Sequence, residues 1–219
     1  MILSKSFLNS VHVNGVQYSE SMSPAHNSTR HDRDGVARAA LVLLDEVGLA
    51  DLSMRRIAGR LDVQPSALYW HFASKQALLA ELADRITAGI PHGDASVLDT
   101  ARGIRDALFA YRDGAELVLS TYALRLGSSS AQTAVHDALV TEGADAPEQR
   151  AAAIMHFILG HATLVQQRMH ADSYGAVLPD DASPAADDVT AGLDRVFDLG
   201  VTALSGTVRS SSAPLRDRA

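Results

Sequence analysis

The chain has 219 residues, of which 47% are hydrophobic and 21% charged, and its net charge is −7. These values are typical of a globular protein with a sizeable core, and they exclude a disordered, fibrous or disulfide-rich chain. Because the chain has no cysteine, thiol catalysis and cysteine-based zinc sites are also excluded. No apolar run approaches the roughly 18 residues of a membrane span, and the N-terminus lacks the continuous apolar segment of a secretory signal. We therefore expect a cytoplasmic protein with no membrane partner.

The charge is unevenly spread along the chain. Residues 1–75 carry eight Lys or Arg and seven Asp or Glu, whereas residues 76–219 carry 11 and 19. An acidic protein is a poor match for nucleic acid as a whole, but a local basic face on one helix matters more than the total charge. The nearly neutral first third is therefore where a nucleic-acid surface is expected.

The first predicted helix follows a polar segment, residues 1–31, which we interpret as a flexible arm; Met1 and Met22 are alternative natural starts. From Asp32 onward, apolar residues recur at the spacing of one helix face until Gly48, a residue that commonly ends a helix. Asp32 places a negative charge where the helix dipole favours it. The sequence therefore predicts an amphipathic helix between these two residues.

Two short helices are predicted next, over residues 53–61 and 64–71, with about three residues between them. Ser53 can cap the first helix, and Pro65 fits the first turn of the second. This spacing is that of a helix-turn-helix, in which the second helix enters the major groove of DNA. A fourth, longer helix is expected to begin after Ser74.

The outward side chains of the two short helices match nucleic acid. They include Tyr69, Trp70 and three arginines, and this combination makes a poor solvated surface. Taken alone, the arginines fit a solvated helix face, Trp70 fits a cover for the core, and His71 fits a packed or capping histidine. At this spacing the whole set favours DNA binding. The three arginines are Arg55, Arg56 and Arg60.

The rest of the chain is also predicted to be helical, because no segment alternates with period two for long. The predicted helices span residues 97–111, 113–126, 131–142, 147–171 and 186–206, with a loop at 172–185. The expected fold is all-α: an N-terminal three-helix helix-turn-helix domain over 32–75, then a larger C-terminal helical regulatory bundle over 76–206, and a disordered tail at 207–219. An enzyme is not expected, because neither a Gly-rich phosphate loop nor a nucleophile elbow occurs.

The run from Arg38 to Leu79 resembles the DNA-binding domain of TetR-type transcriptional regulators. The residues that carry the resemblance are Ala39-Ala40, Leu44, Gly48, Leu52 to Ala58, Leu61 to Val63, Leu68 to Phe72, Lys75 and Leu78-Leu79. One departure is Asp62, where the family usually has glycine. Because Asp tolerates the left-handed conformation better than most residues, we expect the turn to form at a small cost.

The resemblance implies roles for ten residues of the predicted helix-turn-helix. Arg55 would reach a base, since a bidentate pair with guanine is the commonest specific contact. Contacts to the DNA backbone would come from Ser53, Tyr69, His71 and Lys75. The residues at or near base edges would be Gln64, Pro65, Ser66, Ala67 and Trp70. The implied partner is a double-stranded DNA operator.

In the C-terminal half a weaker resemblance extends to the tetracycline repressors, through Arg112 to Ala115 and Gly160 to Leu164. Their drug-binding residues do not carry over. Val118 stands where those repressors have a magnesium-binding histidine, and valine cannot ligate a hard cation. Thr100 and Ile104 stand where they have an Asn and a Phe. We therefore expect no metal and no cofactor, and a small apolar or aromatic effector.

Candidate ligand-binding residues lie on the predicted helices between 97 and 126 and between 147 and 171. They are Thr100, Ile104, Val118, Tyr122, Met155, Ile158 and His161. His161 lies on the apolar stripe of its helix, where it is either a buried histidine satisfied by a hydrogen bond or a ligand contact. The run from Gln166 to Arg168 is interpreted as the polar end of the same helix.

The last two predicted helices are long and apolar over more than one face, which suits a four-helix bundle between two subunits, as the resemblance also implies. The predicted function is a ligand-responsive repressor that binds a palindromic operator as a homodimer and is released by a small organic effector. Two alternatives stay open. One is a DNA-binding regulator without an effector, and the other is a helical small-molecule-binding protein with a vestigial DNA face.

Overall fold

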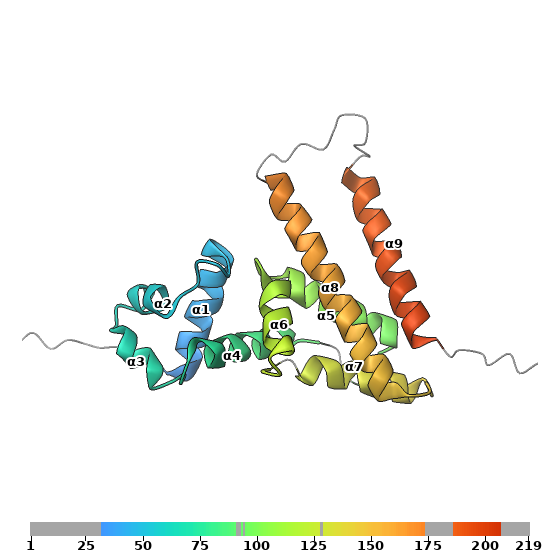
Figure 1. The fold of residues 1–219 in the computed structure, drawn as a ribbon, viewed down its shortest axis with the longest axis horizontal. Coiled ribbons are helices and arrows are strands. Elements are labelled where there is room, and N and C mark those ends of the chain that lie inside the picture. The colour runs from blue at the N-terminus through green and yellow to red at the C-terminus, as the bar shows by residue number, and fades with distance from the viewer. Residues whose placement is uncertain (1–31, 91–92, 94, 128, 174–185, 207–219) are drawn as a thin grey trace, which may run out of the picture. The chain divides into compact units, whose positions relative to one another are not determined.

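The structure is a computed structural model that describes residues 32–90, 93, 95–127, 129–173 and 186–206. The predicted arm at 1–31, the tail at 207–219 and most of the predicted loop at 172–185 lie outside these residues. Within the described part of the chain, the regular elements are all helices (Figure 1), so the predicted all-α class is confirmed. They are α1 (Arg33–Val47), α2 (Met54–Arg60), α3 (Pro65–Tyr69), α4 (Lys75–Thr87), α5 (Val97–Phe109), α6 (Gly114–Ala123), α7 (Ser129–Thr141), α8 (Pro147–Ser173) and α9 (Ala186–Ser205).

The first four helices begin at the caps and first turns that the sequence predicts, but α2 ends one residue before the predicted end at 61 and α3 two residues before the predicted end at 71. The side chains of Asp32, Ser53 and Ser74 accept hydrogen bonds from backbone amides in the first turns of α1, α2 and α4. Gly48 ends α1 with φ 79°, and Asp62 occupies the turn after α2 with φ 52°. These caps fix the angle at which each helix leaves the one before it.

Helix α6 ends three residues earlier than the sequence predicts. Arg125 has φ 56°, its amide donates to Tyr122 O at 2.9 Å, and the amide of Leu126 donates to Thr121 O at 2.8 Å. This pair of bonds is the Schellman arrangement, which closes a helix at a left-handed residue that is usually glycine. An arginine in this place was not foreseen, because no glycine marks the helix end.

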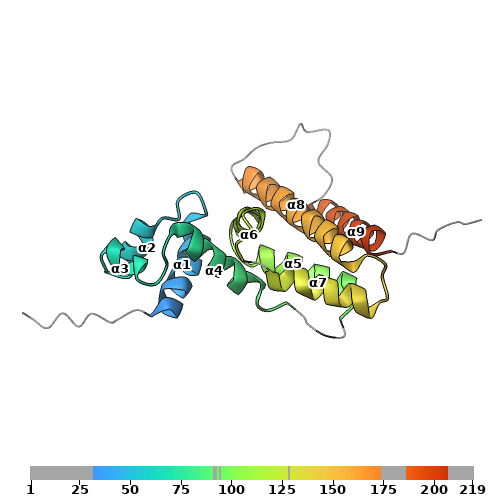
Figure 2. The same ribbon diagram turned by 60° about the horizontal axis from the view of Figure 1, so that its bottom comes forward.

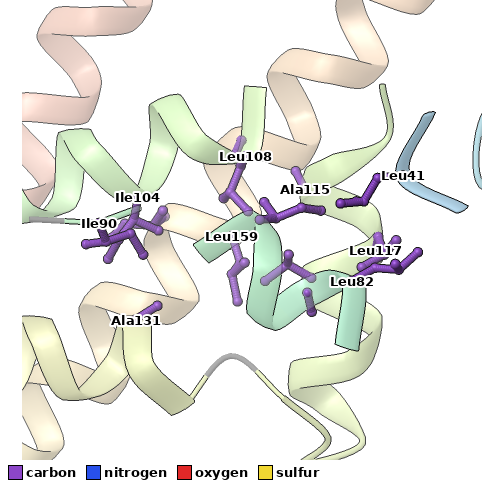
Figure 3. Packing of buried hydrophobic residues seen from close by; sticks show 14 of the residues in the cluster. Leu41, Leu82, Ile90, Ile104, Leu108, Ala115, Leu117, Ala131 and Leu159 are labelled. Carbon is purple, nitrogen blue, oxygen red and sulfur yellow. The ribbon is translucent and has the colours of Figure 1, made fainter. Parts of the chain in front are cut away.

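A single buried apolar cluster joins the first four helices to the helices that follow. Figure 3 shows Leu41 of α1 and Leu82 of α4 beside Leu117 of α6, and all three side chains are buried. Further along the chain, α8 and α9 lie side by side in both views (Figure 1 and Figure 2), and α5 packs against each of them. A displacement of α6 would therefore press directly on α1 and α4, because packed interiors deform little.

Gln166 corrects one expectation from the sequence, because it is buried rather than part of the polar end of α8. Its Nε2 donates to the carbonyl oxygens of Leu108 at 3.2 Å and Tyr111 at 3.0 Å, and its Oε1 accepts from the amide of Ala115 at 3.0 Å. One side chain thus satisfies three backbone groups at the connection between α5 and α6. Helical spacing alone cannot distinguish such a residue from an exposed glutamine.

None of the helices in the described ranges is long and apolar enough to cross a membrane.

Candidate nucleic-acid interface and ligand pocket

The helix pair α2 and α3 is held together by its inner side chains. Met54, Ile57 and Ala58 of α2 and Leu68 of α3 are buried. The small Ala58 also accepts a hydrogen bond at its carbonyl from the amide of Val63, at 3.0 Å, which tightens the connection. The pair therefore presents its remaining side chains outward as one surface.

The outward surface at the end of α3 is strongly aromatic. Trp70, the only tryptophan of the chain, is 89% exposed, and Tyr69 is 52% exposed. The interpretation of Trp70 as a cover for the core does not fit this exposure. An exposed indole next to an exposed phenol is unfavourable in water, and an exposed aromatic patch of this kind usually marks a binding surface.

Two of the three arginines of α2 form ion pairs with described residues, and the third does not. Arg60 bonds to Glu46 at 2.5 Å, and Arg56 lies 3.4 Å from Asp51. Arg55 forms no salt bridge with any residue that the structure describes. Its guanidinium is therefore the one on α2 that can reach another molecule without first breaking a described ion pair.

Nine of the ten residues predicted to contact DNA lie on α2, α3 and the residues that flank these helices, and the tenth, Lys75, is the first residue of α4. Arg55, Gln64, Ser66, Tyr69 and Trp70 are exposed, whereas Ser53, Pro65, Ala67, His71 and Lys75 are partly buried. Ser53 caps α2, with its Oγ accepting from the amide of Arg56 at 3.3 Å. Its hydroxyl hydrogen is not used in that bond and can still be donated to a phosphate oxygen. Geometry therefore leaves all ten available for the predicted contacts.

Sequence reasoning missed Arg33, which ties α3 to α1 and α4. Its Nη1 donates to His71 O at 2.9 Å, and its Nε and Nη2 donate to Glu81 Oε2 at 3.1 and 2.8 Å. The guanidinium also lies 4.4 Å from the centre of the Phe72 ring. The hydrogen bond from Arg33 lowers the pKa of Glu81, so this carboxylate stays charged at neutral pH. An arginine in the first turn of a helix gives no sequence signal for such long-range contacts.

The turn between α5 and α6 docks onto the C-terminal end of α1. Asp113 accepts from the amide of Leu49 at 2.8 Å, and the amide of Arg112 donates to Asp45 at 3.0 Å. A Cβ at Gly48 would lie 2.6 Å from Asp113 Oδ2, so glycine is required there by close approach as well as by its positive φ. Arg112 and Asp113 therefore form a polar contact between α1 and the helices behind it, beside the shared apolar cluster.

The seven candidate ligand residues lie in different surroundings within the described part of the chain. Thr100, Ile104, Val118, Met155 and Ile158 are buried in the core. His161 is half-buried between α8 and α9, with its ring centre 5.9 Å from that of Phe157 and 5.2 Å from that of Phe197. Burial, and secondarily the charge of Arg105, lowers the pKa of His161. No hydrogen bond joins this imidazole to a described residue.

Tyr122, the remaining candidate, lines a partly open pocket of about 580 Å³ at the end of α6. Its hydroxyl donates to Gln132 Oε1 at 3.0 Å, and its ring stands nearly perpendicular to that of His156, with 5.8 Å between centres. Burial raises the pKa of Tyr122, so the phenol is protonated at neutral pH. Around it the pocket is lined by Leu119, Arg125, Ser129, Gln132 and His156.

Within the described part of the chain, no three His, Asp or Glu side chains come close enough together to hold an ion. The residue at the position of the expected metal-binding histidine, Val118, is buried and apolar.

A short helix pair with an exposed aromatic end and a free arginine, carried on a helical bundle, defines a helix-turn-helix DNA-binding protein. Residues 37–82 match the family described as "Bacterial regulatory proteins, tetR family". The chain is 33% identical over 197 residues to the tetracycline repressor protein class G of Vibrio anguillarum, covering 80% of this chain and 92% of that protein.

Solved structures agree with this match. The crystal structure of Mycobacterium smegmatis BioQ is similar with a TM-score of 0.66 and 33% identity, over 79% of this chain and 97% of that one. BioQ with its natural double-stranded DNA operator is similar with a TM-score of 0.63 and 30% identity, over 80% and 98%. The chain belongs to the tetR family and is a DNA-binding transcriptional regulator.

Proposed function

We propose that this chain is a ligand-responsive repressor that binds a palindromic operator as a homodimer and is released by a small organic effector. Residues 32–75 are the DNA-binding domain in this proposal, and residues 76–206 bind the effector and the second subunit. The observation that carries it is the exposed end of α3, where Trp70 is 89% exposed and Tyr69 lies beside it. The similarity to BioQ, which was crystallised with its double-stranded DNA operator, supports an operator as the partner.

Apolar exposure on α8 and α9 supports the dimer. Leu199 is 71% exposed and Leu164 is 66% exposed, although both lie on long helices whose other faces are buried. Two adjacent helices with exposed leucines can pack against the same two helices of a second copy of the chain, which forms an isologous four-helix bundle. A dimer also places two recognition helices on one operator, with half-sites about 34 Å or a multiple apart.

The pocket at Tyr122 supports the effector. Its volume lies within the range of small-molecule sites. It opens at the C-terminal end of α6, and the N-terminal end of the same helix follows Asp113, which bonds to Leu49 at the end of α1. A ligand that prefers a shifted α6 would weaken DNA binding by its difference in affinity for the two states. A tenfold loss of operator affinity needs a preference of about 1.4 kcal/mol.

The experiment is a titration of the full chain against labelled DNA from upstream of its own gene and a scrambled duplex of equal length. Anisotropy of the DNA and fluorescence of Trp70 should change together with the upstream fragment at concentrations that leave the scrambled duplex free. A panel of metal-free aromatic compounds, and tetracycline with and without magnesium, is then added to the complex. Release by a metal-free compound is expected. Equal binding to both duplexes, or release only by tetracycline with magnesium, contradicts the proposal.

A further inference from the structure

The pocket at Tyr122 is positively charged and rich in hydrogen-bond donors. We propose that its ligand is an aromatic organic acid whose anionic group binds beside Arg125. This inference rests on the proposed function, since it names the chemical class of the effector. It depends on three features of the pocket, which are a cation without a carboxylate partner among the described residues, polar groups that donate, and an apolar wall of suitable size.

The cation is Arg125, which lines the pocket directly after α6. It forms no salt bridge with any described residue, and its exposed side chain is fixed at its base by a left-handed backbone with φ 56°. Non-glycine residues adopt this conformation uncommonly, and strained positions tend to occur at ligand sites. The end of α6 thus carries an arginine at the pocket lining, in a position where a glycine is usual.

The other polar groups around the pocket also favour an anion. Tyr122 donates its hydroxyl hydrogen to Gln132 Oε1, which leaves the amide hydrogens of Gln132 without a described acceptor. Ser129 is the first residue of α7, and the first amides of a helix have no partner inside it and carry partial positive charge. No Asp or Glu belongs to the described lining. The carboxylate of Asp84 approaches Gly127, which lines the pocket, and has an interaction partner of its own.

The apolar part of the pocket suits a flat ring. Leu119 and the ring of Tyr122 line it, and His156 meets the Tyr122 ring edge to face. Aromatic rings bind one another in such offset or perpendicular arrangements, and a cavity of about 580 Å³ accepts one to three fused rings. A cationic ligand would be repelled by Arg125, and a purely apolar one would leave the guanidinium and amide without acceptors. An aromatic carboxylate satisfies both sets of groups.

The test pairs each acid with its neutral amide. Benzoic, salicylic, 2-naphthoic and anthracene-9-carboxylic acids and their primary amides are titrated calorimetrically into the full chain. At least one acid should bind, and at least tenfold more tightly than its amide. Arg125→Gln should weaken that acid at least tenfold, and Arg125→Lys should restore part of the loss. Arg38→Gln removes an arginine from an exposed ion pair on α1, far from the pocket lining, and should leave acid binding unchanged.

The outcomes separate this inference from the proposed function. Binding of no acid, equal binding of acid and amide, or an Arg125→Gln protein that binds acids like the parent would overturn the inference. If neutral compounds release the operator while acids do not, the inference is wrong and the proposed function stands. If acids bind in the manner expected but neither they nor any other compound releases DNA, the pocket assignment stands and the repressor proposal is wrong.

Discussion

The helices α1 to α4 and the helices α5 to α9 differ in where their important polar residues lie. On α2 and α3, Arg55 and Trp70 point into solvent, while the interior is apolar and the polar caps are local. In the second region a polar side chain, Gln166, holds the interior together, and the predicted ligand residues Thr100 and Val118 are packed in the core. A DNA surface is therefore a property of single helices, whereas a ligand pocket is a property of the way in which several helices meet.

The largest effect expected from this comparison is on stability. Gln166→Ala leaves the carbonyl of Leu108 and the amide of Ala115 without their partner, whereas the carbonyl of Tyr111 keeps its hydrogen bond from the amide of Gly114 at 3.0 Å. Buried groups left without a partner cost about 1–3 kcal/mol each, so we expect a loss of about 2 kcal/mol or more in the free energy of unfolding. Urea unfolding of the variant measures it.

Gln167→Ala is the matched control, since Gln167 is exposed on the next position of α8. Its free energy of unfolding should stay within about 0.5 kcal/mol of the parent. Equal stability of the two variants would show that Gln166 does not brace the connection between α5 and α6, and the contrast between the two regions would lose its main support.

The same contrast explains which features could be predicted from sequence. Local chemistry determined the caps at Ser53 and Ser74, which were predicted from neighbouring residues, whereas the turn at Asp62 was predicted from the family resemblance. Contacts over long sequence distances could not be predicted, because one sequence contains no record of them. Arg33 bonds to Glu81 across 48 positions, and Gln166 bonds to Ala115 across 51.

The pocket illustrates the limit further. Seven candidate residues were chosen by position on apolar helices and by resemblance, yet the described pocket includes Tyr122 alone among them. It also includes Gln132 and His156, which the sequence did not single out as candidates. Tyr122, Gln132 and His156 lie on α6, α7 and α8, so their convergence depends on how three helices pack, which one sequence does not show.

The second prediction concerns the dimer. Leu199→Arg places a charge on the exposed apolar face of α9, and loss of one buried leucine side chain costs about 2 kcal/mol. The parent should have about twice the mass of 23.2 kDa by light scattering at micromolar concentration, and the variant should be largely monomeric. Leu124→Arg is the control, because this leucine is 61% exposed at the end of α6. A monomeric parent, or equal dissociation of both variants, contradicts the dimer.

A third, smaller effect would sharpen the assignment of α2 and α3. Arg55→Ala should cost about 1–3 kcal/mol in operator affinity and relax specificity at one base pair of each half-site. Lys75→Ala should instead weaken binding to all sequences alike and reduce the salt dependence by about one unit. Binding isotherms against a set of single-base operator variants at several salt concentrations distinguish the two. Unchanged binding by both variants would show that this surface does not contact DNA.

The smallest expected effect is on the pH dependence of stability, and it differs in sign between two histidines of the second region. Burial lowers the pKa of His161 below its ordinary 6.5, with Arg105 adding to the shift and Asp194 opposing it. The folded protein then binds a proton here less readily than the unfolded chain, so stability is lost as pH falls from 6.5 through the lowered value. The hydrogen bond to Asp137 raises the pKa of His136, with Glu148 adding to it. The contribution of His136 to the free energy of unfolding is therefore fully present below pH 6.5 and is lost as the pH rises through the raised pKa.

The two variants should therefore change the pH dependence of the melting temperature in opposite ways. His161→Phe keeps a ring between Phe157 and Phe197 and should lessen the decline in Tm between pH 7 and pH 5. His136→Asn should lower the Tm at pH 5 and leave the Tm at pH 8 nearly unchanged. This change in Tm should be smaller than that of His161→Phe, since His136 is on the surface. Each difference should be within about 2 °C of the parent, because both rings retain access to water. If the Tm of each variant differs from that of the parent by the same amount at every pH, the pKa of neither histidine changes on folding. The ring of His161 between Phe157 and Phe197 would then be as accessible to water as a surface histidine.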